Sequence, residues 1–411
     1  MKITGIEDLH CDAGWRNFSF LKIMTDEGVV GYSEYNEGYG SKGLTGVIRP
    51  LAESLIGTDP RAVGRISASL YGQTRQAPGG LISQAIAAIE NALVDIKAKA
   101  LGIPVYEMLG GAVRDEIELY WSHCGTYRLH HHEILGVKQL SSLEGCREMG
   151  REVAEAGFRA LKTNMFLFEE EGPQRVRGPE VYMPGFSAGG PSDTLRHTGL
   201  WDLALNPDDR VKKAVRNQIL ALQEGAGPGV KVHLDINFNF KTEGYLGMVH
   251  ELDDLGLQWF EIDTYNPTAL RDIRRSCKTP IASCESLYGR RQYRPFFEQH
   301  SVDVAIIDVP WNGILESVKI AAMAEPYEIN VAPHNFYGHL STLMSAHFCA
   351  VLPHLRIMEI DPDDVPWKDD LVTVPPVIEN GVLKLPTGPG WGADPDEDAI
   401  RAHPPKGGWR G

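Results

Sequence analysis

The sequence has little of three things: paired cysteines, positive charge and long apolar runs. Its six cysteines are scattered without a Cys-x-x-Cys pair, which argues against a zinc site or disulfide framework and predicts reduced thiols. The formal net charge of −15 disfavours binding to nucleic acid or to an anionic membrane. No window is apolar over the roughly 18 residues of a membrane span, and the N-terminus lacks a signal-peptide core. We therefore expect a cytoplasmic protein that acts on a small molecule.

What is present is an ordinary globular composition, with 43% hydrophobic and 23% charged residues in a chain of 411. This length predicts about two domains. Residues 18–24 and 29–35 alternate like strands around a Thr-Asp-Glu-Gly turn, which predicts a hairpin or meander. Helical spacing follows at residues 51–55 and 82–101. We expect residues 1–115 to form an α+β capping domain.

From about residue 116 short β-branched runs alternate with helical stretches. The predicted strands are residues 117–121, 160–164, 230–237, 259–262, 281–285, 304–309, 330–333 and 357–360. Eight such units over about 250 residues predict a parallel (β/α)₈ barrel of the TIM type, which we assign to residues 116–374. The tail, residues 375–411, has strand and turn signals without a helical period, so we expect it to leave the barrel unextended and return to the capping domain.

One interval, residues 167–206, is far longer than an ordinary strand-to-helix loop and is rich in Gly and Pro. Long loops at this end of a barrel are often lids, and a decorative loop is the alternative.

Polar residues follow the predicted strands at the end where a barrel of this kind carries its active site. In chain order they are Lys162, Asn164, Asp235, Asn237, Glu261, Glu285, Asp308, His334 and Glu359. Asp235, Glu261, Glu285, Asp308, His334 and Glu359 follow one another at intervals of 23 to 26 residues, about one strand-and-helix unit, so we expect these side chains to share one mouth.

Three acidic residues in register on the third, fourth and fifth strands are the strongest signal. Asp235, Glu261 and Glu285 would converge there, and their charges would repel unless a cation neutralised them. Carboxylate oxygens without Cys or His favour Mg²⁺ over Zn²⁺, so we predict one Mg²⁺ per site. Asn237 would hydrogen-bond a ligand or simply cap its strand.

Asp308 and His334 end neighbouring strands, where a carboxylate accepts an imidazole N–H and orients the ring. This pair predicts a general base or acid. The run of histidines at 130–132 is expected to be structural or exposed.

Taken together, these residues resemble the enolase superfamily, specifically its mandelate racemase group of acid-sugar dehydratases and epimerases. The resemblance extends over nearly the whole chain and includes ALVDIKAKALGIPVYEMLGG before residue 112 and NGVLKLPTGPGWG near the end. It implies Asp235, Glu261 and Glu285 as metal ligands, and a dyad of Asp308 and His334. It also implies that Glu359 faces the substrate and that the protein forms an even-numbered homo-oligomer.

The second strand departs from that group. It usually carries Lys-x-Lys with a base at the second lysine, but here the sequence is Lys162-Thr163-Asn164. A two-base racemisation therefore loses support. Dehydration gains it, with His334 as the base and Lys162 as electrostatic partner of the substrate carboxylate.

We accordingly predict a Mg²⁺-dependent dehydratase of an aldonate or aldarate that forms a 2-keto-3-deoxy acid through an enediolate. Trp15 and Arg16, in a polar loop of the capping domain, are predicted substrate contacts, as is Asn164. The alternatives are an epimerase, racemase or cycloisomerase acting through the same enediolate, or a non-catalytic sugar-acid binding protein.

Overall fold

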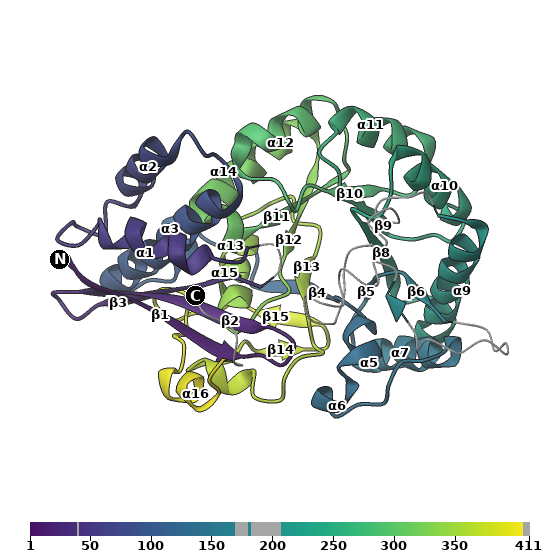
Figure 1. The fold of residues 1–411 in the computed structure, drawn as a ribbon, viewed down its shortest axis with the longest axis horizontal. Coiled ribbons are helices and arrows are strands. Elements are labelled where there is room, and N and C mark those ends of the chain that lie inside the picture. Colours follow the sequence, from purple (N-terminus) through teal and green to yellow (C-terminus); the bar gives the residue numbers. More distant parts are fainter. Residues whose placement is uncertain (39–40, 169–179, 182–206, 406–411) are drawn as a thin grey trace.

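The computed structural model describes residues 1–38, 41–168 and 207–405, together with the backbone of residues 180–181. Figure 1 shows a small sheet with its helices beside a larger ring of strands and helices. No helix in the described ranges combines the length and apolar character that crossing a membrane requires.

The N-terminal part is an antiparallel sheet of order β1-β2-β3 with helices on it. The elements are β1 (Ile3–Asp12), β2 (Asn17–Thr25), β3 (Val30–Tyr35), α1 (Leu44–Glu53), α2 (Val63–Thr74), α3 (Gly80–Leu101) and α4 (Val105–Met108). At Gly31 a Cβ atom would come within 2.2 Å of the Ala92 carbonyl oxygen, so glycine allows α3 to pack closely on β3.

The predicted hairpin and the helix over residues 82–101 are confirmed by β2, β3 and α3. The helix expected at residues 51–55 is wrongly placed, because α1 begins at Leu44 and ends at Glu53. Leu44, Ile48 and Ala52 are four residues apart and buried, so the apolar face starts earlier than the prediction had it.

Eight parallel strands of the described chain form the barrel that the sequence predicts. They are β4 (Glu116–Trp121), β5 (Ala160–Thr163), β8 (Lys231–Asn237), β9 (Trp259–Ile262), β10 (Ile281–Ser283), β11 (Val304–Asp308), β12 (Asn330–His334) and β13 (Met358–Ile360). β13 pairs with β4, and a bridge from Val331 to Leu355 joins β12 to the segment that leads into β13. The ring is thereby closed (Figure 1).

Helices cover the outside of the ring, and apolar side chains fill its inside. The helices between strands are α7 (Leu143–Glu155), α9 (Asp209–Ala226), α10 (Thr242–Leu252), α11 (Pro267–Ser276), α12 (Gly289–Glu298), α14 (Ile314–Ala324) and α15 (His339–Ala350). Shorter elements are α5 (Thr126–His130), α6 (His132–Leu135), α13 (Val309–Asn312), η1 (Glu325–Tyr327), η2 (Asp369–Leu371) and the ladder of β6 (Phe166–Leu167) with β7 (Glu180–Val181). Tyr120, Trp259 and Ile306 belong to the inner cluster, so the barrel is a packed core and the polar groups are left to its mouth.

The fifth strand is shorter than predicted. β10 ends at Ser283, because Cys284 has φ 92°, which an extended strand does not allow. Glu285 therefore sits in the turn after the strand rather than at its end.

The prediction that the tail, residues 375–411, does not extend the barrel is wrong for its first half. The hairpin of β14 (Ile378–Glu379) and β15 (Val382–Lys384) pairs antiparallel with β4 and so does extend the barrel sheet. Trp391 then returns to the capping domain, where its indole N–H donates to the Tyr32 carbonyl at 2.8 Å. The helix α16 (Glu397–Ala402) packs on β1. The domain limits at residues 115 and 374 stay a prediction.

Candidate active site

Lys162 lies at the centre of the polar side chains that end the barrel strands. Its ammonium nitrogen is 3.2 Å from both carboxylate oxygens of Glu261 and 2.9 Å from Oε1 of Glu359. Oδ2 of Asp235 lies 3.5 Å from the same nitrogen. The four side chains come from β5, β9, β13 and β8 and are all buried. The structure thus brings these four predicted residues together.

A second group joins His334 to the same mouth. The parallel register of β11 and β12 sets Asp308 directly beside His334, and Nδ1 of the imidazole lies 2.7 Å from Oδ2 of Asp308. Asp308 also accepts from the Trp311 amide at 2.7 Å and the Tyr337 hydroxyl at 2.5 Å. Nε2 of His334 faces Glu285, whose Oε2 is 3.6 Å away. The predicted dyad is therefore formed, and the second ring nitrogen, Nε2, faces the carboxylate cluster.

The environment of this cluster disfavours the ionised form of several of its carboxyl groups. Burial raises the pKa of Glu261 and of Glu285, and the neighbouring acidic groups raise each further. Burial, followed by Asp235 and Glu261, raises the pKa of Asp263 to about 7. Oδ2 of Asp263 is buried and has no hydrogen-bond partner among the described residues. One ammonium does not offset so much negative charge.

Nearby acidic side chains raise the pKa values of both Lys162 and His334. Burial alone would lower the pKa of Lys162, but Glu261 and Glu359 outweigh it and hold the pKa well above its usual range. Burial likewise opposes the charged form of His334, yet Glu285 and Asp308 raise its pKa to about 10. The pKa of Glu359 is lowered because Lys162 and His334 more than offset its burial.

A divalent cation fits the chemistry of this cluster. Among the described residues no set of three His, Cys, Asp or Glu side chains is gathered as a metal site, because the Lys162 ammonium lies among the carboxylates instead. Asp235, Glu261 and Glu285 nevertheless offer oxygen ligands at the ends of adjacent strands, and the buried Oδ2 of Asp263 beside them has no hydrogen-bond donor among the described residues. These three residues are the ones that would hold Mg²⁺, as the sequence predicts.

The two predicted asparagines contact one another. Asn164 donates from its amide to Oδ1 of Asn237 at 3.3 Å and accepts from the Thr126 hydroxyl at 2.7 Å. Asn237 has φ 48°, a backbone conformation that asparagine tolerates better than most residues. The second strand therefore presents an amide where a base would be needed for two-base chemistry.

The two predicted contacts of the capping domain lie at the barrel but are already engaged. Trp15 stacks on His131 with ring centroids 4.7 Å apart and an interplanar angle of 10°. Arg16 donates to the Phe336 carbonyl at 2.5 Å and to Oδ2 of Asp364 at 2.7 Å, with its side chain 5% exposed. Arg16 thus ties the capping loop to the segment after β12, and its contact with substrate stays a prediction.

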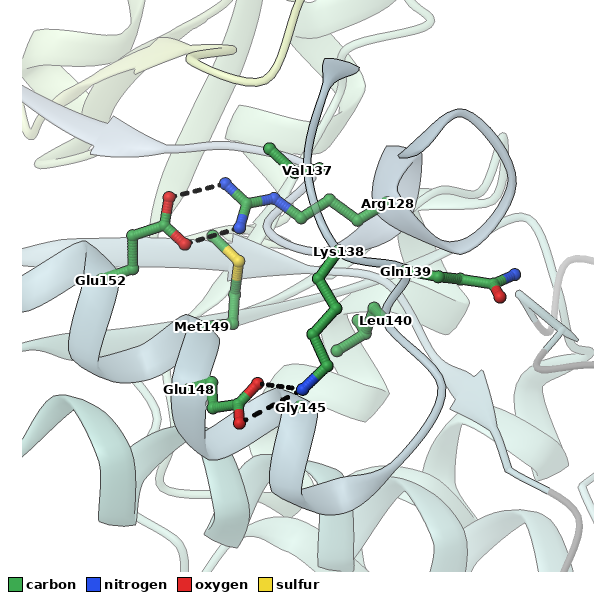
Figure 2. Close-up of a pocket in the computed structure, with 9 residues that line it drawn as sticks. All are labelled: Arg128, Val137, Lys138, Gln139, Leu140, Gly145, Glu148, Met149 and Glu152. Atoms are coloured by element: carbon green, nitrogen blue, oxygen red, sulfur yellow. Dashed lines mark hydrogen bonds and ion pairs between the residues drawn. The ribbon is translucent and has the colours of Figure 1, made fainter. Parts of the chain in front are cut away.

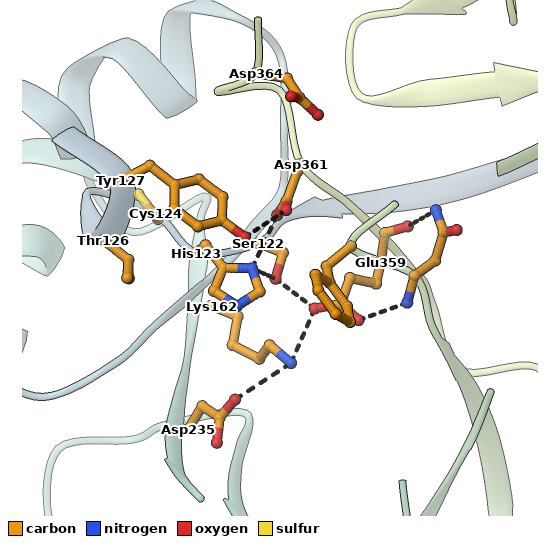
Figure 3. A network of polar contacts seen from close by, with 12 residues as sticks. Ser122, His123, Cys124, Thr126, Tyr127, Lys162, Asp235, Glu359, Asp361 and Asp364 are labelled. Atoms are coloured by element: carbon orange, nitrogen blue, oxygen red, sulfur yellow. Dashed lines mark hydrogen bonds and ion pairs between the residues drawn. The ribbon is translucent and has the colours of Figure 1, made fainter. Parts of the chain in front are cut away.

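Several residues of the site were missed by the sequence reasoning. Figure 3 shows Ser122 and His123, which follow β4, beside Glu359 and Asp361. Ser122 donates to Oε1 of Glu359, and the amide of Asn335 donates to Oε2 of Glu359 at 2.8 Å. The signal that could have found Ser122 and His123 is the one used for the other strands, namely polar residues after an apolar run.

A hollow on the outer surface is unrelated to this site. Its lining comes from α5, α7 and the segment between α6 and α7, and it includes no predicted site residue (Figure 2). Arg128 pairs with Glu152, and Lys138 pairs with Glu148 at 3.0 Å, so its charges are already matched. The predicted lid, residues 167–206, lies outside the described residues from 169 to 206, apart from the β7 backbone.

Comparison with known families agrees with this geometry. Residues 13–110 match the N-terminal domain of mandelate racemase and muconate lactonizing enzymes, and residues 146–399 match the enolase C-terminal domain-like family. The chain belongs to the enolase superfamily. Its place in the mandelate racemase and muconate lactonizing enzyme group confirms the resemblance seen in the sequence, and the barrel with its capping domain is the fold of that group.

Relatives within the enolase superfamily carry different activities in their names. A D-xylonate dehydratase from Haloferax volcanii is 27% identical over 98% of this chain and 89% of its own length. A D-galactonate dehydratase from Ralstonia pickettii is 26% identical over 97% of this chain and 94% of its own. A solved structure from Burkholderia xenovorans, described as a candidate L-alanine-DL-glutamate epimerase, is 47% identical with a TM-score of 0.92 over 99% of both chains. The same protein has been solved with magnesium and fumarate.

Proposed function

We propose that this chain is a Mg²⁺-dependent dehydratase of an acid sugar, an aldonate or aldarate, which it converts to a 2-keto-3-deoxy acid. The observation that carries the proposal is the direction of the His334 and Asp308 pair, whose Nε2 faces Glu285 of the buried carboxylate cluster. The dehydratase names of the two acid-sugar relatives support it.

Each residue of the site has a separate role that follows from its position. Asp235, Glu261 and Glu285 would hold the cation, which when bound supplies positive charge that offsets the enediolate and lowers the pKa of His334 toward that of a general base. His334 takes the α-proton at Nε2, while Asp308 fixes the ring through Nδ1. Lys162 provides an ammonium for the substrate carboxylate, a charge that strengthens as the enediolate forms.

The absence of a base on the second strand favours elimination over racemisation. Asn164 has its amide nitrogen bonded to Asn237 and cannot accept a proton from carbon. A single imidazole can remove the α-proton and leave an enediolate that expels the 3-hydroxyl. Differential binding of that enediolate over the substrate is what accelerates the reaction.

The first test is a screen of aldonates and aldarates of four to six carbons, D-xylonate and D-galactonate included, with Mg²⁺ or with EDTA. We expect Mg²⁺-dependent keto-acid formation from at least one acid. His334→Asn should lower its turnover by about 10² to 10⁴-fold, the usual loss for a general base, while His300→Asn, remote from the mouth, should not. Wild-type turnover by the His334 variant would contradict the assignment.

Epimerisation is the second candidate, because the Burkholderia xenovorans neighbour is described as an epimerase. Incubation in D₂O separates the two reactions. A dehydratase gives a keto acid, whereas an epimerase gives a deuterium-labelled isomer with no loss of water. Failure of every acid in both assays would favour the non-catalytic binding protein. The cytoplasmic location and the even-numbered homo-oligomer stay predictions.

A further inference from the structure

A second histidine and carboxylate pair lies at the mouth of the barrel. Nδ1 of His123 is 3.0 Å from Oδ1 of Asp361 and 3.2 Å from the Ser122 hydroxyl. The imidazole stacks on Tyr127 with centroids 4.9 Å apart and an interplanar angle of 22°. Its side chain is 19% exposed, and no partner of Nε2 is found among the described residues. The ring is thus oriented through one nitrogen and leaves the other available, as in the pair of His334 and Asp308.

The two pairs lie on either side of one aromatic ring. Phe336 contacts both imidazoles, with its ring centroid 5.9 Å from that of His123 and 4.9 Å from that of His334. Ser122 bonds both His123 and Glu359, and Glu359 bonds Lys162, so a polar network runs from His123 to the carboxylate cluster (Figure 3). His123 follows β4, the first strand, which pairs with β5, the second strand, where the base is missing.

Elimination needs a proton for the departing oxygen as well as a base for the α-proton. Asn164 and Asn237 are bonded to each other, and the Lys162 ammonium is held by Glu261 and Glu359. His334 receives a proton in the first half of the reaction. The His123 imidazole takes no part in these contacts, so it can act as the proton donor.

We propose that His123 is a catalytic acid that protonates the departing 3-hydroxyl, so that base and acid are separate histidines. The proposal rests on the dehydratase function proposed above. His334 takes the α-proton to give the enediolate. The electron pair then forms the C2–C3 double bond as the C3–O bond breaks, and the leaving oxygen takes the Nε2 proton of the His123 imidazolium, whose Nδ1–H stays donated to Asp361, and departs as water. The enol tautomerises to the 2-keto-3-deoxy acid, and solvent returns a proton to His123 and removes one from His334.

The test separates the two half-reactions. His123→Asn is the variant of choice because His123 has φ 45°, a conformation in which asparagine is well tolerated. On the acid identified by the screen, in D₂O with Mg²⁺, we expect keto-acid formation to fall by about 100-fold or more. Deuterium should still enter the α-carbon of the recovered acid, because His334 can remove and return that proton.

The matched control is His300→Asn, a histidine with φ 52° at the end of α12, which should retain both activities. His123→Gln, read after circular dichroism has shown it to be folded, repeats the test if the Asn variant does not fold. A structural role for His123 would lower exchange and dehydration together, and that result overturns the proposal, as does unchanged dehydration. If the wild-type protein dehydrates no acid of the panel, the proposed function fails, and this inference fails with it. If the wild type is active and His123→Asn is equally active, only this inference fails.

Discussion

At the scale of single residues, Lys162 places its positive charge among the acidic side chains of the site. Its ammonium contacts Glu261, Glu359 and Asp235, all buried, so in the cation-free protein it supplies the nearest positive charge. A buried ion pair adds little over an apolar replacement of the whole group, but removing one partner leaves uncompensated charge. The ammonium and a metal ion would therefore both offset the charge of these carboxylates, and the two positive charges would repel one another.

Lys162→Met tests this shared role. In EDTA we expect its free energy of unfolding to fall by about 3 to 5 kcal/mol, the usual result of breaking a buried pair. Added Mg²⁺ should raise the melting temperature of the variant more than that of the wild type, because the repelling ammonium is gone. Lys231→Met, at the exposed start of β8, is the control, and equal stability of the two variants in EDTA would contradict the prediction.

At the scale of elements, the loop between β1 and β2 is fastened to the segment that follows β12. Arg16 bonds the Phe336 carbonyl, two residues beyond His334, and the Asp364 carboxylate. Its guanidinium also lies over the rings of Tyr127 and Phe336, at 5.6 and 5.8 Å from their centroids. The capping domain thereby holds the strand end that carries His334, the proposed general base.

Arg16→Lys should loosen this fastening, because lysine cannot reproduce the planar fork of a guanidinium. We expect the free energy of unfolding of the ligand-free protein to fall by more than 1 kcal/mol, the upper range for an exposed pair such as Arg49 with Asp8. Turnover should fall as well. Arg49→Lys is the control, since that arginine makes two bonds to Asp8 but its side chain is 48% exposed. If Arg16→Lys changes only KM, Arg16 contacts substrate and does not act as a fastening.

Sequence reasoning predicted most of the polar residues that follow the barrel strands, and it missed Ser122, His123 and the contacts between residues far apart in the chain. Asp235, Glu261 and His334 follow apolar runs directly, so their common mouth could be inferred from spacing. Glu285 was inferred from the same spacing although it follows a left-handed residue, Cys284, whereas His123, itself left-handed, was missed. The partners of Arg16 are 320 and 348 positions away, and no local pattern encodes such a contact.

At the scale of the whole molecule, the two domains are joined by carboxylates buried between them. Glu34 of β3 accepts from the Gly338 amide at 2.6 Å and the Ser341 amide at 2.9 Å, at the start of α15. Glu90 of α3 accepts from the Leu315 amide of α14 at 3.1 Å. Burial raises the pKa of both carboxyl groups to about 7.

The raised pKa of Glu34 predicts how stability depends on pH. The folded protein holds the proton more tightly than the unfolded chain, whose glutamate has the ordinary value near 4.5. The stabilisation is complete below about pH 4.5 and is lost as the pH rises through about 7. A shift of that size corresponds to about 3 kcal/mol.

Glu34→Gln removes this titration and keeps an oxygen that can accept one of the two amide bonds. The difference between its unfolding free energy and that of the wild type should move in favour of the variant by up to about 3 kcal/mol between pH 4.5 and 8. All other titrating groups are common to both proteins, so urea unfolding across this range isolates Glu34. Glu298→Gln, exposed on α12, is the matched control for replacing a glutamate by glutamine. A constant difference for Glu34→Gln would mean that Glu34 stays ionised throughout, bound by its two amides.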